Sequence, residues 1–335
     1  MLPNSDFQVN LCSQKDLEGL IKFLKRMREE KIISFPLDKT FFIGKYGSSR
    51  GSSAPFNLFI LKNRQKEIIG CSGYVPFRGM FCKKNIEGIV GSDIVIDPGY
   101  GRKFPSLFAT LFFSYSKFVL KEGYFFLNFP QSDVIASNFR RFWWEDFTHF
   151  FELSNPLSLR ISPNIGTISI ETRRIEHFDK EINSFFKRIS SQHHFLLCSD
   201  FEFLNRRYFD NPYHKYVVIL ATKESKILGY LVAEEIGYDI EIVDVVVDLD
   251  YPLLILLLMY KSFTYFGQNK IGKVFSYLSH KHYIEVLKKI GFFCHTKKIC
   301  LFFKICLLFS KIKEHDLARS DKNLYHLNGF TRYSY

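Results

Sequence analysis

Two carboxylates on one predicted strand are well suited to acid–base chemistry. Glu87 and Asp93 lie in the largely apolar run 85–97, which predicts a strand. Because successive side chains of a strand alternate between its faces, residues an even number apart share a face. Either carboxylate could act as a general base if that face borders a cleft. Both could equally be structural or solvated carboxylates, and the sequence leaves the two interpretations open.

A basic, glycine-containing turn follows this strand. Its five candidate phosphate-binding residues are Gly99, Gly101, Arg102, Lys103 and Ser106. The next residues, 106–120, are mostly apolar and predict a helix, whose N-terminus would offer backbone N–H groups and a positive dipole end to phosphate. Glycines let the backbone approach such a group closely. Pro105 removes one N–H donor but is tolerated at a first helical position. The turn is therefore either a phosphate site or a plain strand–helix connection.

The elements that would position these residues occur in a repeated order. In the first half we expect helices over 7–30, 106–120 and 132–142 and strands over 56–62, 67–77, 85–97 and 124–130. In the second half we expect strands over 167–175, 216–222, 226–235, 240–248 and 273–279 and helices over 179–189, 252–266 and 281–290. Gly70 and Gly229 occupy corresponding hairpins. The repeat predicts an internal duplication.

The join falls near 155–166, where prolines and a glycine break the pattern. We therefore expect two domains, 1–160 and 161–335, each with its own mixed central sheet flanked by helices. A length of 335 residues fits two domains of ordinary size.

Composition narrows the class of protein. Apolar residues make up 47% and charged residues 24%, which is typical of a globular chain. The net charge of +12 suits anionic partners without choosing among them. The chain begins without the features of a secretory signal and has no apolar run of about 18 residues, so we expect a cytoplasmic protein.

Metal chemistry is not expected. The seven cysteines are scattered and form no CxxC pair, so they predict neither a zinc knuckle nor a disulfide framework. The adjacent His193 and His194 point in different directions. His280 and His282 have no convincing carboxylate or cysteine at ligand spacing.

The element order and several segments resemble the GNAT-type N-acyltransferases. In that family the fourth strand ends in a V-x-P-x-x-R-G-x-G-x-G/A turn that opens a helix, and the corresponding stretch here is IDPGYGRKFPSL (96–107). Residues 127–144 resemble a family segment found in two-domain acyltransferases of bacterial surface polysaccharide loci. Segments 203–216, 286–292 and 323–330 resemble those tandem proteins too.

The resemblance implies an α/β (α+β mixed sheet) fold with two acyl-CoA acyltransferase domains in tandem, the second degenerate. It implies that acetyl-CoA or another acyl-CoA is the co-substrate, with its pyrophosphate on the turn after the fourth strand. Gln131 stands where the family often has an Asn facing the cofactor arm. The amine acceptor would be a small molecule, in this resemblance an amino sugar or nucleotide-linked sugar, and Glu87 or Asp93 would be the base.

The chain departs from the family pattern at two places. The later glycines of the turn are missing, and Asn138 and Phe139 stand where a tyrosine commonly protonates the leaving thiolate. In the second half the matching turn holds Asp248 and Asp250 with no glycine or basic residue, and these carboxylates would repel a pyrophosphate. We therefore expect only the first half to bind the acyl donor.

Three other functions stay open. A non-catalytic scaffold on a decayed acyltransferase fold would explain the missing glycines and tyrosine. A Fem-type aminoacyltransferase is another tandem use of the fold, with aminoacyl-tRNA as substrate. A nucleic-acid-binding protein would suit the charge, but the basic residues are dispersed and no recognition motif is evident, so no nucleic acid is expected. Contact with a membrane surface stays open, without a membrane span.

Overall fold

The computed structural model describes residues 6–33, 37–47, 56–81, 84–103, 107–111, 114, 125–128, 145–156, 169–193, 195–197, 200–251, 253–266, 272–278, 281–289 and 291–304. The expected helix over 132–142 and the terminal segment 323–330 lie outside these ranges. So do seven residues singled out in the sequence: Pro105, Ser106, Gln131, Asn138, Phe139, His194 and His280.

The first half contains β1 (Gln8–Leu11), the 3-10 turn η1 (Gln14–Asp16), α1 (Leu17–Glu29), α2 (Lys39–Tyr46), β2 (Leu58–Lys62), β3 (Ile68–Phe81), β4 (Lys84–Ile96), the 3-10 turn η2 (Pro98–Lys103), β5 (Phe125–Asn128) and β6 (Glu145–Pro156). The second half contains β7 (Glu171–Ile175), α5 (Glu181–Ile189), η3 (Ser190–Gln192), β8 (Phe195–Leu197), α6 (Phe201–Tyr208), β9 (Tyr216–Lys223), β10 (Lys226–Ile236), β11 (Asp239–Val247), α7 (Leu254–Phe266), β12 (Lys273–Leu278), α8 (Lys281–Lys289) and β13 (Phe293–Lys304).

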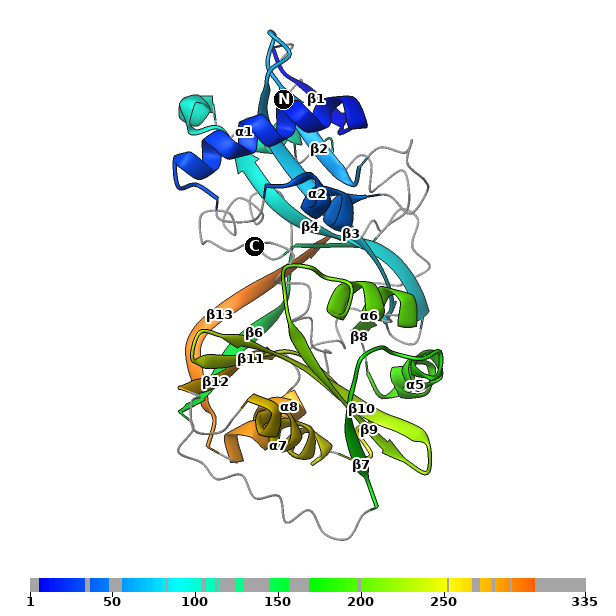
Figure 1. Ribbon diagram of the computed structural model, residues 1–335. Coiled ribbons are helices and arrows are strands. Elements are labelled where there is room, and N and C mark those ends of the chain that lie inside the picture. The colour runs from blue at the N-terminus through cyan, green and yellow to red at the C-terminus, as the bar shows by residue number, and fades with distance from the viewer. Residues whose placement is uncertain are drawn as a thin grey trace.

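The described strands form one continuous sheet, so the expectation of a separate sheet in each half is wrong. The order is β1-β2-β3-β4-β5-β13-β6-β12-β11-β10-β9-β7, and β8 pairs with β3 off this path. The last strand of each half pairs with a strand of the other half: β13 pairs with β5, and β6 pairs with β12, both antiparallel. Figure 1 shows β6 and β13 running together between the two halves.

The strand order reads the same when the two halves are exchanged. Matching β1 to β7, β2 to β9, β3 to β10, β4 to β11, β5 to β12 and β6 to β13 returns the same sequence of neighbours. This symmetry supports an internal repeat, and the boundary at residue 160 stays a proposal.

Helices cover both faces of the sheet because each presents an apolar stripe. On α1, Leu17, Leu20, Leu24 and Met27 are buried at helical spacing and pack against β2 and β3 residues. The opposite face of the first half packs against residues 107–111. In the second half α5 and α6 cover one face, and α7 and α8 cover the other. No helix in the described part of the chain is long and apolar enough to cross a membrane.

Two further contacts join the halves. The far end of β3 pairs with β8, through Gly79–Phe81. The hydroxyl of Tyr213, in the loop before β9, donates to Oδ1 of Asp38 just before α2, at 2.5 Å. The second half therefore contacts the α2 region of the first half as well as its sheet.

The hairpin glycines generate a first prediction. A Cβ at Gly229 would lie 2.6 Å from the backbone oxygen of Val246, whereas one at Gly70 would lie 3.1 Å from that of Val95. We expect Gly229→Ala to lower the free energy of unfolding by about 1–3 kcal/mol, because the backbone must move, and Gly70→Ala to lower it less. Denaturant unfolding checks this, and an equal or reversed effect would contradict it.

Candidate functional site

An irregularity in β4 lies where its pairing with β5 ends. The parallel pairs run from Gly88–Phe125 to Gly91–Asn128, and β4 continues to Ile96. The β3–β4 register shifts at residues 92–95, and Asp93 there has a φ of 47°. A residue other than glycine in this region costs about 1–3 kcal/mol and often marks a functional position.

Asp93 makes a buried ion pair with Lys45 of α2. The side chains are 3% and 4% exposed, and Nζ lies 2.5 Å from Oδ2. Burial raises the pKa of Asp93 above its ordinary value, although the Lys45 ammonium opposes this. The second oxygen, Oδ1, is buried without a hydrogen-bond partner, and so is the hydroxyl of neighbouring Tyr46. Buried polar atoms are nearly always paired, so these two oxygens suit a water or a polar group of a ligand.

The irregularity also separates the two predicted bases. Ile89 and Ile96 are seven positions apart, an odd offset that would put them on opposite faces of a regular strand, yet both pack on the same face. One extra residue is therefore inserted in β4 between them. Glu87 consequently lies on the opposite face from Asp93, and the expected shared face is wrong. Glu87 is exposed and lies 3.4 Å from Arg78 across the β3–β4 hairpin. Whether either residue acts as a base stays a proposal.

The turn after β4 is organised by Asp97, which the sequence analysis missed. Its Oδ1 accepts a hydrogen bond from the N–H of Gly99 at 2.8 Å, and its other oxygen pairs with Arg26 of α1. One backbone donor of the expected phosphate site is thus already used. The backbone of Gly101, Arg102 and Lys103 continues η2, and the side chains of Arg102 and Lys103 lie outside the described part of the chain.

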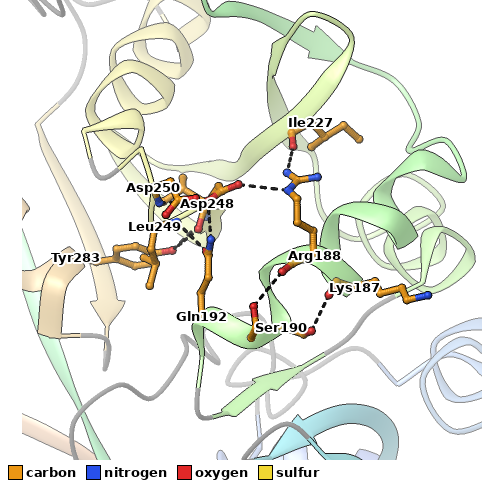
Figure 2. A network of polar contacts seen from close by, with 11 residues as sticks. Lys187, Arg188, Ser190, Gln192, Ile227, Asp248, Leu249, Asp250 and Tyr283 are labelled. Carbon is orange, nitrogen blue, oxygen red and sulfur yellow. Dashed lines mark hydrogen bonds and ion pairs between the residues drawn. The ribbon is translucent and has the colours of Figure 1, made fainter.

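The second half repeats this turn around Asp248, as Figure 2 shows. Its Oδ1 accepts from the N–H of Asp250 at 3.2 Å, and its Oδ2 lies 3.3 Å from Nε of Arg188 on α5. Gln192 closes the turn further, because its amide donates to Asp248 at 2.8 Å and accepts from the N–H of Leu249 at 2.9 Å. Two successive backbone donors are therefore occupied by side chains of the protein.

A short internal repeat underlies both turns. Residues 93–100 read DIVIDPGY and residues 244–251 read DVVVDLDY, so Asp93 corresponds to Asp244. Asp244 also lies beside the end of a parallel pairing and a register shift. Its Oδ2 accepts from the hydroxyls of Tyr208 and Tyr230 at 2.8 and 2.9 Å, whereas Asp93 has Lys45. The repeat is the sequence signal that could have found Asp97, but nothing in the sequence marks Lys45.

Several solved structures have a fold similar to that of this chain. The chain superposes on a GCN5-related N-acetyltransferase from Anabaena variabilis with a TM-score of 0.66 and 14% identity, covering 90% of this chain and 73% of that one. A GCN5-related N-acetyltransferase from Kribbella flavida superposes with a TM-score of 0.61 and 14% identity, covering 90% of this chain and 71% of that one. Saccharomyces cerevisiae N-myristoyltransferase with bound myristoyl-CoA superposes with a TM-score of 0.63 and 11% identity, covering 98% of this chain and 86% of that one.

These similarities establish a mixed α/β fold of the GCN5-related N-acetyltransferase type. No protein-family model matches the chain, and no curated protein sequence matches it either. Within the described residues no group of three or more His, Cys, Asp or Glu side chains could hold a metal ion.

The buried ion pair generates a stability prediction. Lys45→Met leaves the Asp93 carboxylate buried beside no cation, so we expect a loss of about 3–5 kcal/mol at pH 7. The loss should shrink as the pH falls toward 4, because the folded variant takes up a proton on Asp93 before the unfolded chain does. Asp93→Asn added to Lys45→Met should restore much of the stability.

Arg78→Met is the control, because the exposed Arg78–Glu87 pair should contribute less than about 1 kcal/mol. Denaturant unfolding of each variant at pH 7 and pH 4.5 gives the comparison. A Lys45→Met protein as stable as the wild type at pH 7 would contradict a tightly coupled pair.

Glu241 on β11 gives a prediction about pH. Burial raises the pKa of its carboxyl from 4.5 to about 8. The folded state therefore holds a proton that the unfolded state has lost, and wild-type stability should fall as the pH rises from about 4.5 to about 8. Glu241→Gln should remove this dependence and be more stable than wild type at pH 8 by on the order of 3 kcal/mol. If the difference in unfolding free energy between Glu241→Gln and the wild type is the same at pH 5 and at pH 8, the Glu241 carboxyl does not titrate in this range.

Proposed function

We propose that this protein transfers an acyl group, most simply acetyl, from acyl-CoA to an amine, and that the first half binds the donor. The observation that carries the proposal is Asp93. It is a buried, ion-paired carboxylate with one unpaired oxygen, held in a strained backbone conformation beside the end of the β4–β5 pairing. The fold type, shared with N-acetyltransferases and with a structure holding myristoyl-CoA, supports acyl transfer as the reaction.

The donor pyrophosphate would bind after the fourth strand of the first half. Asp97 occupies the N–H of Gly99, and residues 101–103 belong to the 3-10 turn η2, so we assign the phosphates to the charges of Arg102 and Lys103 beside Gly101, where the backbone can be approached closely. Ser106 and Gln131 complete the proposed contacts. Charge supports the choice of half, because the first half carries Arg102 and Lys103 at its turn, whereas the second half has Asp250 where the first has Gly99, and a carboxylate there would repel a pyrophosphate.

Asp93 would serve as the base. The amine nitrogen attacks the thioester carbonyl carbon, the C–N bond forms, the C–S bond breaks, and CoA leaves as a thiolate. The proton lost by the amine passes to Asp93, directly or through water, and solvent protonates the thiolate. A carboxylate whose pKa is raised by burial is a better proton acceptor than an exposed one. Lys45 would hold Asp93 in position and keep it ionised.

The acceptor class rests on sequence resemblance alone. The candidate acceptor is an amino sugar or a nucleotide-linked sugar for a surface polysaccharide. None of the described residues by itself identifies a sugar-binding site. The second half would shape the acceptor side, since its Tyr213 contacts Asp38 near α2.

A non-catalytic binding protein on this fold is the second candidate. The observation that favours it is Asp97, whose carboxylate takes a backbone donor at the place where a phosphate would bind. Measuring donor binding and turnover separately distinguishes the two candidates.

Isothermal titration with acetyl-CoA tests the donor site. Lys103→Glu should abolish binding or weaken it at least about tenfold, because it sets a negative charge against the pyrophosphate. Asp250→Lys, the matched change in the second half, should leave binding unchanged. Circular dichroism checks that both variants fold. A silent Lys103→Glu together with altered binding in Asp250→Lys would invert the assignment, and no wild-type heat at millimolar ligand would favour the non-catalytic candidate.

Turnover of Asp93→Asn tests the base. We expect kcat to fall by roughly 10²–10⁴-fold with acetyl-CoA affinity retained, because the variant cannot accept the proton. Glu87→Gln is the control and should keep kcat within about twofold. If the two substitutions have the opposite effects, Glu87 is the base and the buried pair is structural.

A further inference from the structure

A basic cleft lies beside α1, at the edge of the sheet where β4 ends. Its volume is about 500 Å³, and it is open to solvent. One wall is η1 and α1, and the opposite wall is the turn that joins β2 to β3. Asp97 and Tyr100 border it as well, so the cleft adjoins the turn after β4. A cavity of this volume is large enough for a ligand of nucleotide size.

Cations line both walls of this cleft. Lys22 and Arg26 lie four residues apart on one face of α1, and Gly19 leaves that face open. Lys15 of η1 lines the same wall of the cleft. Lys62 and Lys66 face them from the turn. Five positive charges converging on one cleft repel one another unless anions lie between them.

The carboxylates of the cleft are already engaged. Asp16 lies 2.6 Å from Nζ of Lys62, and Asp97 pairs with Arg26. Glu67 accepts a hydrogen bond from the side chain of Asn63 at 2.9 Å. Among the described residues no ion pair involves Lys15, Lys22 or Lys66, and the five cations that line the cleft outnumber its three carboxylates.

We propose that this cleft binds the phosphate groups of a phosphorylated nucleotide, with Lys15, Lys22 and Lys66 as the phosphate-binding residues. Lysine ammonium groups on two walls can engage separate phosphate oxygens. Tyr100 at the rim and the apolar side chain of Ile68 offer a surface for the base. The nucleotide could be the distal end of the acyl donor or part of a nucleotide-linked acceptor, and the site itself does not require that acyl transfer occurs.

Isothermal titration with adenosine 3′,5′-bisphosphate and with UDP tests the site on the full chain. We expect at least one to bind with an affinity that falls as salt is added. Lys22→Glu/Lys66→Glu should weaken it at least about tenfold. The control pair Lys25→Glu/Arg28→Glu changes the net charge equally on exposed positions of α1 outside the cleft, and it should cost less than about twofold.

A variant that fills the cleft without changing its charge tests whether the nucleotide occupies the cleft itself. A Cβ at Gly19 would lie 3.5 Å from Cδ1 of Ile68, an ordinary contact, so Gly19→Leu should fold and extend a side chain into the cleft. It should weaken the same nucleotide with no change in charge. Three results would overturn the proposal. The first is unchanged nucleotide affinity in Gly19→Leu, and the second is an equal loss of affinity in the two charge-reversal pairs. The third is no binding of either nucleotide at millimolar concentration.

Competition identifies the source of the nucleotide. If the bisphosphate binds and acetyl-CoA displaces it, the cleft holds the end of the donor. If UDP binds together with acetyl-CoA, the cleft holds part of the acceptor. Direct titration of the Lys103→Glu variant with acetyl-CoA tests the donor site separately. Failure of the nucleotide site in the cleft and failure of the proposed acyl transfer therefore give different results.

Discussion

The antiparallel pair of β6 and β13 holds the two halves of the chain together in one sheet. Each of these strands comes last in its half and also pairs with a strand of the other half, β6 with β12 and β13 with β5. Neither half can therefore complete its sheet from its own sequence, and the hydrogen bonds of the central pair fix the two halves against each other. For the same reason, cutting the chain near residue 160 would leave two incomplete sheets with unpaired edges.

The two halves keep one backbone plan and differ in the side chains that surround it. In both, a buried aspartate follows the end of the parallel pairing, and a second aspartate four residues later caps the turn and pairs with an arginine from the first long helix of that half. The second aspartate therefore maintains the fold in both places. The first aspartate differs, since tyrosine hydroxyls satisfy Asp244, whereas Asp93 has a lysine and an unpaired oxygen. This asymmetry supports a functional first half and a structural second half.

Much of the fold follows from local sequence pattern, and most of the site does not. The helical spacing on α1 and the hairpins around Gly70 and Gly229 were predictable because local periodicity encodes them. The exchange of β6 and β13 was not, because it pairs residues far apart in the chain. The shared face of Glu87 and Asp93 failed for a different reason, since one inserted residue reverses the alternation. Lys45 could not be assigned because its partner is set by the packing of α2 on the sheet.

Amide hydrogen exchange with and without saturating acetyl-CoA shows whether only the first half binds the donor, because it reports on backbone N–H groups in both halves of the intact chain. We expect acetyl-CoA to slow exchange in residues 88–103, where β4 ends and its turn follows, and to leave exchange in residues 240–251 unchanged. Slowed exchange at 240–251 without a change at 88–103 would contradict this expectation.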